Sequence, residues 1–558
     1  MYQYNDHDKA LLAKRLAQFR DQTTRYLAGD LSDDEYKQLR LRNGVYEQLH
    51  APMLRVAIPY GMFTSDQMRT LAKVADDYDR GFGHMTTRQN LQFNWIPLEK
   101  IPDALEELAE FQMHAIQTSG NCIRNITSDP LAGAIGDEIE DPRPWCELIR
   151  QWSSFHPEFN WLPRKFKIAV TGARNDRAAI EVHDIGLRLR HDEAGESVFD
   201  VWVGGGLGRT PVVGKLLREG LPGADLLTYL EATLRVYNRA GRRDNLYKAR
   251  IKILVNALGI DAFRDLVDAE WQVTRKSVRT LEGVDIDRMR SFFHKELAPQ
   301  NVVAVELADS PADSLAESSS APAFNAWLKQ NTREHRVPGY RVVMISLKSS
   351  ERAAGDITST QMRGVADLAD TYCDGDIRST HDQNLVLAHV PVQDLRNLWT
   401  SLKELDLAVP NIGTLSDMIV CPGLDYCSLA NATSISIWDQ INDRFDDLDY
   451  LHDLGDVKIR ISGCMNACGH HHVADIGILG VDKKGVEWYQ LTLGGRSTTG
   501  ARIGKRIGPS VAKADVAQAV ERILEVYTTL RIEGESFVNT LDRIGIEPFQ
   551  ERVYAVAA

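Results

Sequence analysis

The sequence predicts an α+β protein built from two copies of one large mixed α/β module. Three observations lead to this prediction: a gapless internal repeat, strand–helix–strand patterns inside each copy, and a linker-like stretch between the copies. At 558 residues the chain is too long for one hydrophobic core, and 43% hydrophobic with 26% charged residues is typical of a globular protein. We therefore expect several domains related by duplication.

The repeat is strongest in one pair of segments, which align without gaps and share the tripeptides Gln-Met-Arg and Gln-Asn-Leu. Two further pairs align at slightly smaller offsets. The matched pairs are residues 64–92 with 358–386, 167–186 with 458–477, and 201–208 with 491–498. Residues 308–323 are rich in Ser, Pro and Ala, so we interpret them as part of the linker between the copies.

Strand–helix–strand patterns give the local fold. Residues 53–61 and 91–97 are strand-like, and residues 65–79 between them have helical spacing. Residues 165–172 and 457–463 are short strands that run into glycine turns. Repeated in each copy, these units predict mixed sheets covered by helices.

Four cysteines are the first candidate site. Of the seven in the chain, Cys421, Cys427, Cys464 and Cys468 form a C-x5-C and a C-x3-C pair, both expected on loops after strands. An odd, sparse set is not a disulfide framework. The C-x5-C spacing is wide for zinc, and four thiolates are the usual complement of an iron–sulfur cluster. Spacing favours such a cluster but leaves a zinc site or unrelated thiols open.

The repeat also shows that the copies have specialised. The aligned pairs are Cys464 with Ala173, Cys468 with Arg177, and Asp382 with Arg88. The second copy holds the thiols and the first holds cationic side chains, a division that a purely structural role does not require.

Composition limits the partners. A net charge of −13 argues against nonspecific nucleic-acid binding. No apolar run approaches the roughly 18–20 residues that cross a bilayer, and residues 1–22 lack a signal-peptide core. We expect a cytoplasmic protein without a membrane or nucleic-acid partner.

The cysteine segments, CPGLDYC (421–427) and GCMNACG (463–469), resemble the cluster signature of the siroheme-dependent sulfite and nitrite reductases. Further motifs of the family follow in the same order, so the resemblance spans residues 40–540. Within the family, the sequence most resembles the sulfite reductase haemoprotein (beta component). These motifs are LRVAIPYG, TTRQNLQF, IRNITSDP, LPRKFK and GGGLG.

This resemblance implies two cofactors, a [4Fe–4S] cluster on the four cysteines and a siroheme whose iron also takes the Cys468 thiolate. It further implies siroheme contacts from Arg88, Gln92 and Asn466. Finally, it implies a substrate-anion site on the distal face of the siroheme, made by Arg55, Arg124, Lys165 and Lys167. In a strand Lys165 and Lys167 share a face, which suits this role.

The implied activity is the six-electron reduction of sulfite to sulfide in assimilatory sulfur metabolism. Nitrite reductases of the family typically carry asparagine at the position of Lys167, so the resemblance favours sulfite, with siroheme nitrite reductase, making ammonia, as the alternative. No flavin or nicotinamide motif is present, so electrons come from a flavoprotein reductase or a ferredoxin. A rival of another class is a non-catalytic protein with zinc on the cysteines and a regulatory anion on the basic residues.

The resemblance also implies an architecture of ferredoxin-like half-domains related by a pseudo-two-fold, with the cofactors between the halves. The predicted domains are a helical arm (1–48), a half-domain (49–125), a siroheme/substrate domain (126–307), a linker (308–334), a half-domain (335–410) and an iron–sulfur/siroheme domain (411–558). Two features fall outside the pattern. His84 stands where many relatives have arginine, and the run His470–His472 has no assigned role.

Overall fold

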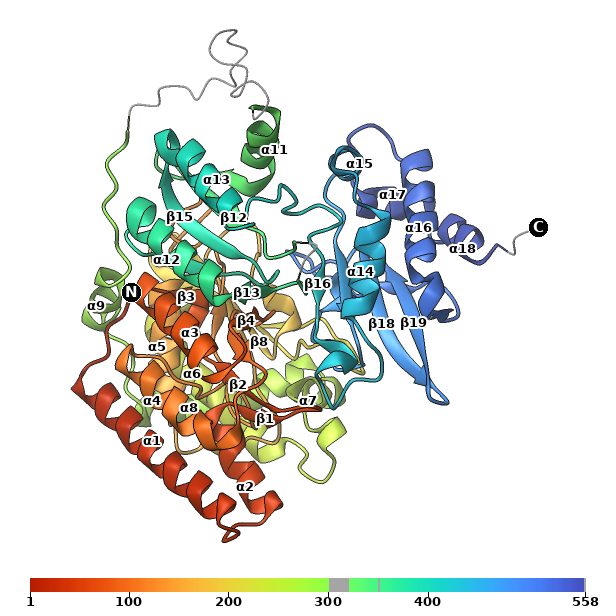
Figure 1. Cartoon of the computed structure of the whole chain (residues 1–558). Coiled ribbons are helices and arrows are strands. Elements are labelled where there is room, and N and C mark those ends of the chain that lie inside the picture. Colours follow the sequence, from red (N-terminus) through yellow and green to blue (C-terminus); the bar gives the residue numbers. More distant parts are fainter. Residues whose placement is uncertain (301–320, 350–351, 556–558) are drawn as a thin grey trace. The chain divides into compact units, whose positions relative to one another are not determined.

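The computed structural model describes residues 1–300, 321–349 and 352–555 (Figure 1). The chain divides into two compact units, which are described separately. The first comprises residues 1–206, 212–298 and 357–381, and the second comprises residues 207–211, 299–356 and 382–558. In the described parts of the chain, no helix is both long and apolar enough to cross a membrane.

The first unit begins with two capped helices, α1 (Asp6–Leu27) and α2 (Asp33–Arg40). Asn5 and Ser32 each accept a hydrogen bond from the N3 backbone, and the N3 carboxylates of Asp8 and Glu35 return it. These capping boxes satisfy amides that the first helical turn leaves unpaired. A helical arm was the prediction for this segment.

A four-stranded antiparallel core sheet follows, in the order β1-β2-β5-β4, and β13 is added beside β4. Its strands are β1 (Val45–Glu47), β2 (Pro52–Val56), β4 (Phe82–Met85), β5 (Leu91–Phe93) and β13 (Asp356–Thr358). Helix α3 (Ser65–Tyr78) follows the short strand β3 (Met62–Phe63), and helix α4 (Ile101–Glu110) follows β5. Strand β3 pairs with β14 (Ile377–Ser379) of the same unit.

Helix α12 (Ser359–Cys373) is the repeat counterpart of α3, and the two helices are joined by reciprocal ion pairs. Arg69 binds Asp370 at 2.5 Å, while Arg363 binds Asp76 at 2.5 Å. Each pair joins an arginine of one copy to the aspartate of the other at equivalent repeat positions. Such reciprocity is the mark of a pseudo-two-fold axis, so the structure supports the predicted duplication.

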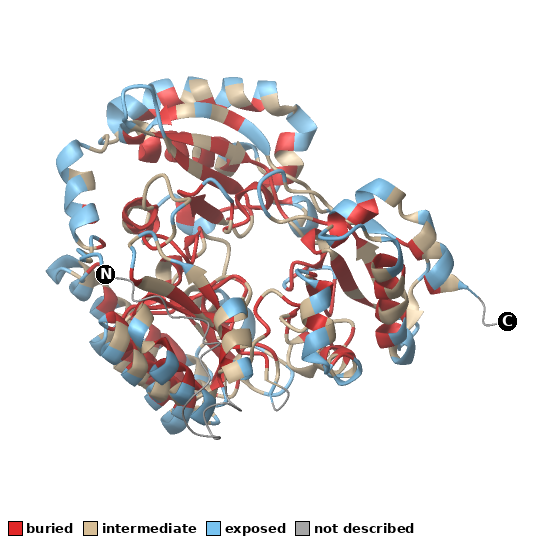
Figure 2. Ribbon diagram, turned by 90° about the horizontal axis from the view of Figure 1, so that it is seen from above, coloured by how far each residue is buried: buried red, intermediate tan, exposed pale blue. Residues whose placement is uncertain are grey.

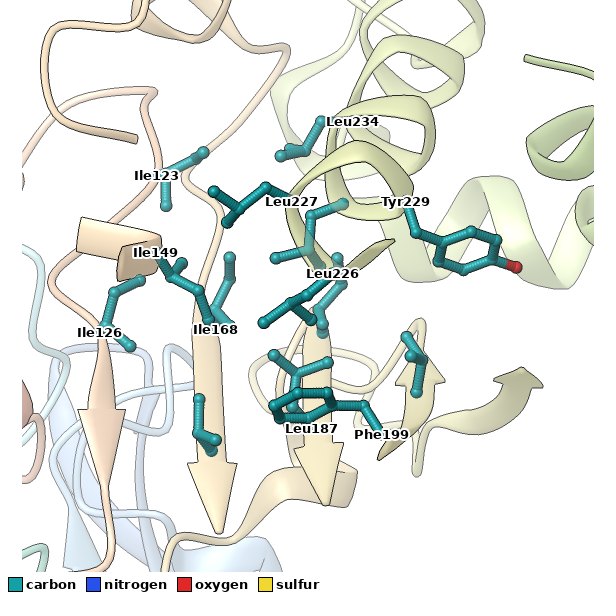
Figure 3. Close-up of a cluster of buried hydrophobic side chains, with 14 of the residues drawn as sticks. Ile123, Ile126, Ile149, Ile168, Leu187, Phe199, Leu226, Leu227, Tyr229 and Leu234 are labelled. Atoms are coloured by element: carbon teal, nitrogen blue, oxygen red, sulfur yellow. The ribbon is translucent and has the colours of Figure 1, made fainter. Parts of the chain in front are cut away.

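The larger sheet of the first unit has the order β10-β9-β8-β7-β6, with β6, β7 and β8 parallel and the rest antiparallel. Its strands are β6 (Thr127–Ser128), β7 (Ile168–Thr171), β8 (Ile185–His191), β9 (Ser197–Val203) and β10 (Lys215–Pro222). Leu226, Leu227 and Leu234 of α6 (Leu226–Ala240) pack with Ile168 and Leu187 of the sheet (Figure 3).

Further helices of the first unit are α5 (Arg143–Ser153), α7 (Ile251–Leu258), α8 (Ile260–Ser277) and α9 (Gly283–Ser291). The α5 face buries Trp145 and Ile149 in the same apolar cluster. Figure 2 shows buried residues along the strands and exposed residues on the outer faces of helices.

The second unit repeats the large sheet, as β16-β17-β18-β19-β20, again with three parallel strands followed by antiparallel ones. Its strands are β16 (Ile419–Val420), β17 (Ile459–Ser462), β18 (Ile476–Lys483), β19 (Val486–Leu493), β20 (Lys505–Arg506) and β21 (Val511–Ala512). The helices in this part of the chain are α14 (Ile435–Arg444), α15 (Leu448–Leu454), α16 (Val516–Leu530), α17 (Phe537–Ile544) and α18 (Glu547–Tyr554). The α+β prediction is therefore confirmed.

The second unit also contains the antiparallel strands β11 (Thr332–Glu334), β12 (Tyr340–Ile345) and β15 (Leu385–Pro391), which pair in that order. Helices α11 (Ala321–Asn331) and α13 (Leu395–Glu404) lie near them in the chain. Residues 321–334 of the predicted linker thus form regular structure, because Phe324 and Trp327 are buried. The remaining linker residues, 308–320, lie outside the described residues, and the domain boundaries stay predictions.

The glutamine of the repeated Gln-Asn pair makes the same backbone hydrogen bond in both copies. The Gln89 side chain accepts a hydrogen bond from the Ser128 backbone of β6, and the Gln383 side chain accepts one from the Val420 backbone of β16. Both glutamines have a left-handed backbone, with φ of 55° and 61°. The motif therefore ties each half-domain to the first strand of the large sheet that follows it.

Candidate functional site

The four predicted cluster cysteines lie on two neighbouring loops of the second unit. Cys421 follows β16 and Cys427 follows a short 3-10 turn, while Cys464 follows β17 and Cys468 precedes another 3-10 turn. Because β16 and β17 are parallel neighbours, their carboxyl ends meet at one edge of the sheet. The sequence prediction that both pairs occupy loops after strands is confirmed.

Gly463 joins the two loops. Its carbonyl accepts hydrogen bonds from the amides of Asn431 and Ala432, and its own N–H donates to Cys421 Sγ at 3.2 Å. A Cβ at this position would lie 2.5 Å from the Ala432 carbonyl oxygen and 2.8 Å from Gly423 Cα. The backbone approach therefore requires glycine.

The thiols interact with one another. Burial, with the nearby Cys468, raises the pKa of Cys421 to about 12. Burial also raises the pKa of Cys464, which interacts with Cys468 and Cys427 and receives hydrogen bonds from the backbone and side chain of Asn466. Four thiols on two adjoining loops, with N–H···S bonds to Cys421 and Cys464, are a donor set that fits a [4Fe–4S] cluster.

Arg124 and the two predicted lysines are brought together by one parallel bridge in the first unit. Ile123 pairs with Phe166, the Phe166 N–H donates to the Cys122 carbonyl, and the Arg124 N–H donates to the Phe166 carbonyl. Ile123 and Phe166 are both buried, so the alternation of the strands turns Arg124, Lys165 and Lys167 to the opposite face. The shared face predicted for the lysines agrees with this pairing.

Arg55 lies in a row across the first sheet. It pairs with Gln92 on β5, and Gln92 in turn pairs with His84 on β4. The Arg55 guanidinium donates to Gln92 Oε1 at 3.1 Å. His84 is thus buried beside Gln92 and Arg55, on the face that carries two of the predicted site residues.

Thr118 links Arg55 to Arg124. Its hydroxyl donates to the Arg55 carbonyl at 3.0 Å, and its carbonyl accepts from Arg124 Nη1 at 2.8 Å. Thr118 therefore connects the backbone of Arg55 to the guanidinium of Arg124.

Arg88 is held by three groups: Thr127 Oγ1 at 3.0 Å, His183 Nε2 at 2.6 Å and the Asn125 carbonyl at 2.6 Å. Burial, reinforced by Arg124, lowers the pKa of Arg88 to about 9. A buried guanidinium whose charge is opposed by another cation calls for an anionic partner.

Three more cations belong to this region, and sequence reasoning missed them: Arg164, Arg250 and Lys252. Burial and Arg250 lower the pKa values of Arg164 and Lys252, the latter to about 8. Arg250 is paired at 2.7 Å with Asp184, which also accepts the Lys167 backbone N–H. Arg164 lies inside the LPRKFK motif and could have been found there, but Arg250 and Lys252 carry no motif.

Together, Arg55, Arg88, Arg124, Arg164, Lys165, Lys167, Arg250 and Lys252 are called the cation cluster below. Burial and neighbouring cations lower the pKa values of Arg88, Arg164 and Lys252, so the charged forms of these three side chains would be stabilised by added negative charge. Siroheme carries many carboxylates, which would supply that charge. The residues present therefore fit this cofactor.

The histidine run adopts a different role at each position. His470 has a left-handed backbone, with φ of 58°, and His472 Nε2 lies 3.1 Å from the Gly208 carbonyl. His471 is fully buried, and its ring is tilted by 43° against that of His472 with the ring centroids 3.9 Å apart. Its ring nitrogens have no hydrogen-bond partner among the described residues. By the repeat alignment it replaces the core residue Ile180, which is consistent with packing beside the cluster loop.

Family comparison covers most of the chain. "Nitrite and sulphite reductase 4Fe-4S domain" matches residues 119–275 and 414–557, and "Nitrite/Sulfite reductase ferredoxin-like half domain" matches residues 46–111 and 341–405. All four predicted cluster cysteines fall inside the second match of the 4Fe-4S domain.

Two relatives have equal identity and different names. The chain is 28% identical to "Sulfite reductase [ferredoxin] 1" of Mycolicibacterium paratuberculosis over 500 residues, which cover 87% of this chain and 81% of the relative. It is also 28% identical to "Ferredoxin--nitrite reductase" of Synechococcus elongatus over 547 residues, 93% of this chain and 96% of the relative. The solved structure of the Mycobacterium tuberculosis NirA protein has the same fold, with a TM-score of 0.75 and 24% identity over 93% of this chain and 92% of that chain.

These matches identify the cofactors of the chain as siroheme and a [4Fe–4S] cluster, as the sequence predicted.

Proposed function

We propose that the chain, which belongs to the nitrite and sulphite reductase family, reduces sulfite to sulfide with six electrons. Membership makes it an oxidoreductase of this family, and the choice of sulfite rests on the residues of this chain. The choice rests on two lysines, Lys165 and Lys167, which stand on either side of Phe166 in the chain. Phe166 is buried, and both lysines lie on the opposite face, together with Arg124.

In this proposal the cluster would be held by Cys421, Cys427, Cys464 and Cys468, and the Cys468 thiolate would also hold the siroheme. Cys468 is the exposed member of the four, whereas Cys421 and Cys464 are buried. The siroheme would be contacted by Arg88, Gln92 and Asn466. Its carboxylates would also pair with Arg250 and Lys252. When bound, the two cofactors supply electrons to the substrate one at a time.

The anion site proposed on the distal face uses Arg55, Arg124, Lys165 and Lys167. Guanidinium and ammonium groups bind the oxyanion and polarise its S–O bonds as negative charge develops on oxygen. Each of the three oxygens leaves as water, so protons must be delivered at the same place. The two lysines, whose ammonium groups are donors only, relay these protons from solvent.

Charge favours sulfite over nitrite. A second lysine on the substrate face gives the site one more positive charge than asparagine would, and the more highly charged anion gains most from it. Nitrite reduction to ammonia is the alternative. A nitrite reductase relative supports it, because this relative and the sulfite reductase relative are both 28% identical to the chain.

The proposed electron donor is a ferredoxin. Both relatives are named for their dependence on ferredoxin, which favours this donor over a flavoprotein reductase. The net charge of −13 means that an acidic donor would need a locally basic docking surface.

Steady-state kinetics on one anaerobic preparation test the substrate. We expect a higher kcat/KM for sulfite than for nitrite with a chemical one-electron donor, and sulfide as the product. Lys167→Asn should shift this ratio toward nitrite, while Lys329→Asn, on the exposed side of α11, should leave it unchanged. A wild-type preference for nitrite, with ammonia as product, would overturn the sulfite proposal and leave the family and cofactors in place.

A further inference from the structure

The first unit contains a basic cavity that lies apart from the cation cluster. It has a volume of about 260 Å³ and lies between helix α1, the turn after α2, the 116–122 segment and the 160–163 segment. Three arginines line it: Arg15, Arg42 and Arg243. No member of the cation cluster is among its lining residues.

The described residues that line this cavity include no aspartate or glutamate. Burial and the neighbouring Arg42 lower the pKa of Arg15 to about 10, and burial lowers the pKa of Arg42. Arg15 donates only to the neutral oxygens of Asn43 and Gln18 among the bonds of the described residues. The cavity therefore concentrates positive charge without an internal counter-charge.

The arginines are held in place before any ligand arrives. The Arg42 guanidinium stacks on the Trp161 ring at 3.7 Å, and its buried Nη2 has no hydrogen-bond partner among the described residues. Arg243 donates to the Trp161 carbonyl at 3.0 Å and to Asn238 Oδ1 at 2.5 Å. These contacts hold two of the three guanidinium groups at the wall of the cavity.

We propose that this cavity is a second anion site, which binds one small oxyanion of the sulfite or sulfate type. Its volume lies below the range of about 300–1,000 Å³ that is usual for larger ligands, which favours a small anion over a nucleotide. The uncharged lining includes the side-chain amides of Asn121 and Asn160, which are further hydrogen-bond donors.

The cavity borders the proposed reaction site. Cys122, which lines the cavity, interacts electrostatically with both Arg42 and Arg124. The segment that carries Gly120 is shared as well, because Gly120 lines the cavity and its carbonyl accepts two bonds from Arg124. An oxyanion in the cavity would stand next to the arginine proposed to bind substrate. The second site thus holds substrate anion close to the reaction site, an inference that rests on the proposed function.

Binding is tested on the oxidised holoenzyme with sulfate, which needs no electrons and is independent of the proposed function. Sulfate is titrated against chloride at constant ionic strength, by calorimetry, with wild type, Arg42→Gln and Arg243→Gln. We expect each variant to weaken one sulfate site about tenfold or more, because a charge-assisted hydrogen bond is lost. Arg242→Gln is the matched control, since Arg242 is the exposed neighbour of Arg243 and pairs with Asp244.

A distal-site variant, Lys167→Asn, separates the two sites, because it should leave the cavity's sulfate binding intact. Crystals soaked in selenate should show anomalous density between Arg42 and Arg243. If Arg42→Gln fails to fold, Arg243→Gln still decides, because Arg243 is exposed. Sulfate binding unchanged in Arg243→Gln, or selenate density only at the distal site, would overturn the proposal.

Discussion

Lys348 is a fully buried charge in the second unit. Its ammonium group donates to Asp417 Oδ1 at 3.0 Å, to Asn384 Oδ1 at 2.6 Å and to the Asp382 carbonyl at 2.6 Å. Its side chain is 0% exposed and that of Asp417 is 7% exposed. Asp417 lies just before β16, so this network joins the second half-domain to the strand that leads to Cys421.

Lys348→Met removes one partner of a buried ion pair and leaves the Asp417 carboxylate uncompensated. Such a loss costs about 3–5 kcal/mol. A unit of this size loses about 2–4 °C of Tm for each kcal/mol, so Tm should fall by about 6–20 °C. Differential scanning calorimetry of the holoenzyme measures the shift, and the exposed Lys329→Met is the control.

The double variant Lys348→Met/Asp417→Asn separates charge from packing. Asn384 donates to Asp417 Oδ1 and Gly413 donates to Asp417 Oδ2, so the introduced amide would keep one of these two hydrogen bonds and remove the unpaired charge. The double variant should therefore be more stable than Lys348→Met alone. The reasoning would be refuted if the Tm of Lys348→Met equalled or exceeded that of Lys329→Met. It would also be refuted if the double variant had a lower Tm than Lys348→Met alone.

Two further predictions concern the cofactor sites. Gly463→Ala should lower iron and acid-labile sulfide per chain, because the new Cβ meets backbone atoms of Gly423 and Ala432, in and beside the other cysteine loop. Gly136→Ala, with open space around it, should keep the wild-type content, and equal contents in both variants would contradict the argument. Burial and then Arg250 lower the pKa of Lys252 from 10.5 to about 8. Folding of the apoprotein therefore disfavours the charged form of Lys252, which lowers the free energy of unfolding below pH 8. This loss of stability disappears as the pH rises from about 8 to 10.5. The apoprotein should therefore gain Tm relative to Lys252→Met between pH 8 and 10.5, and parallel curves for the two proteins would count against the shift.

The sequence predicted those parts of the fold that rest on local patterns and on the duplication. The Gln-Asn repeat aligned the two copies, and the alignment agrees with the structure, since Gln89 and Gln383 accept equivalent hydrogen bonds. The cysteine loops were placed after strands because a short β-branched run followed by glycine has a clear pattern. The same alignment also placed Arg69 opposite Arg363, whose ion pairs proved reciprocal.

What the sequence did not reveal depends on tertiary proximity. Arg250 and Lys252 join Lys167 only because Asp184 bridges the strand to the start of α7, more than sixty residues further along the chain. The burial of His471 likewise follows from packing, since nothing in three adjacent histidines says which ring points inward. The anion cavity is assembled from separate segments, none of which carries a motif.

The central claim is that Cys468 joins the cluster to the siroheme, and the Cys468→Ser variant tests it most directly. Iron, acid-labile sulfide and siroheme absorption are measured on the purified variant, together with sulfide formed from sulfite. Cys373→Ser is the control, because Cys373 is a buried thiol outside the cluster loops. We predict that Cys468→Ser loses siroheme or its coupling to the cluster and no longer forms sulfide, while the control retains both. A Cys468→Ser protein with both cofactors and full activity would contradict the account.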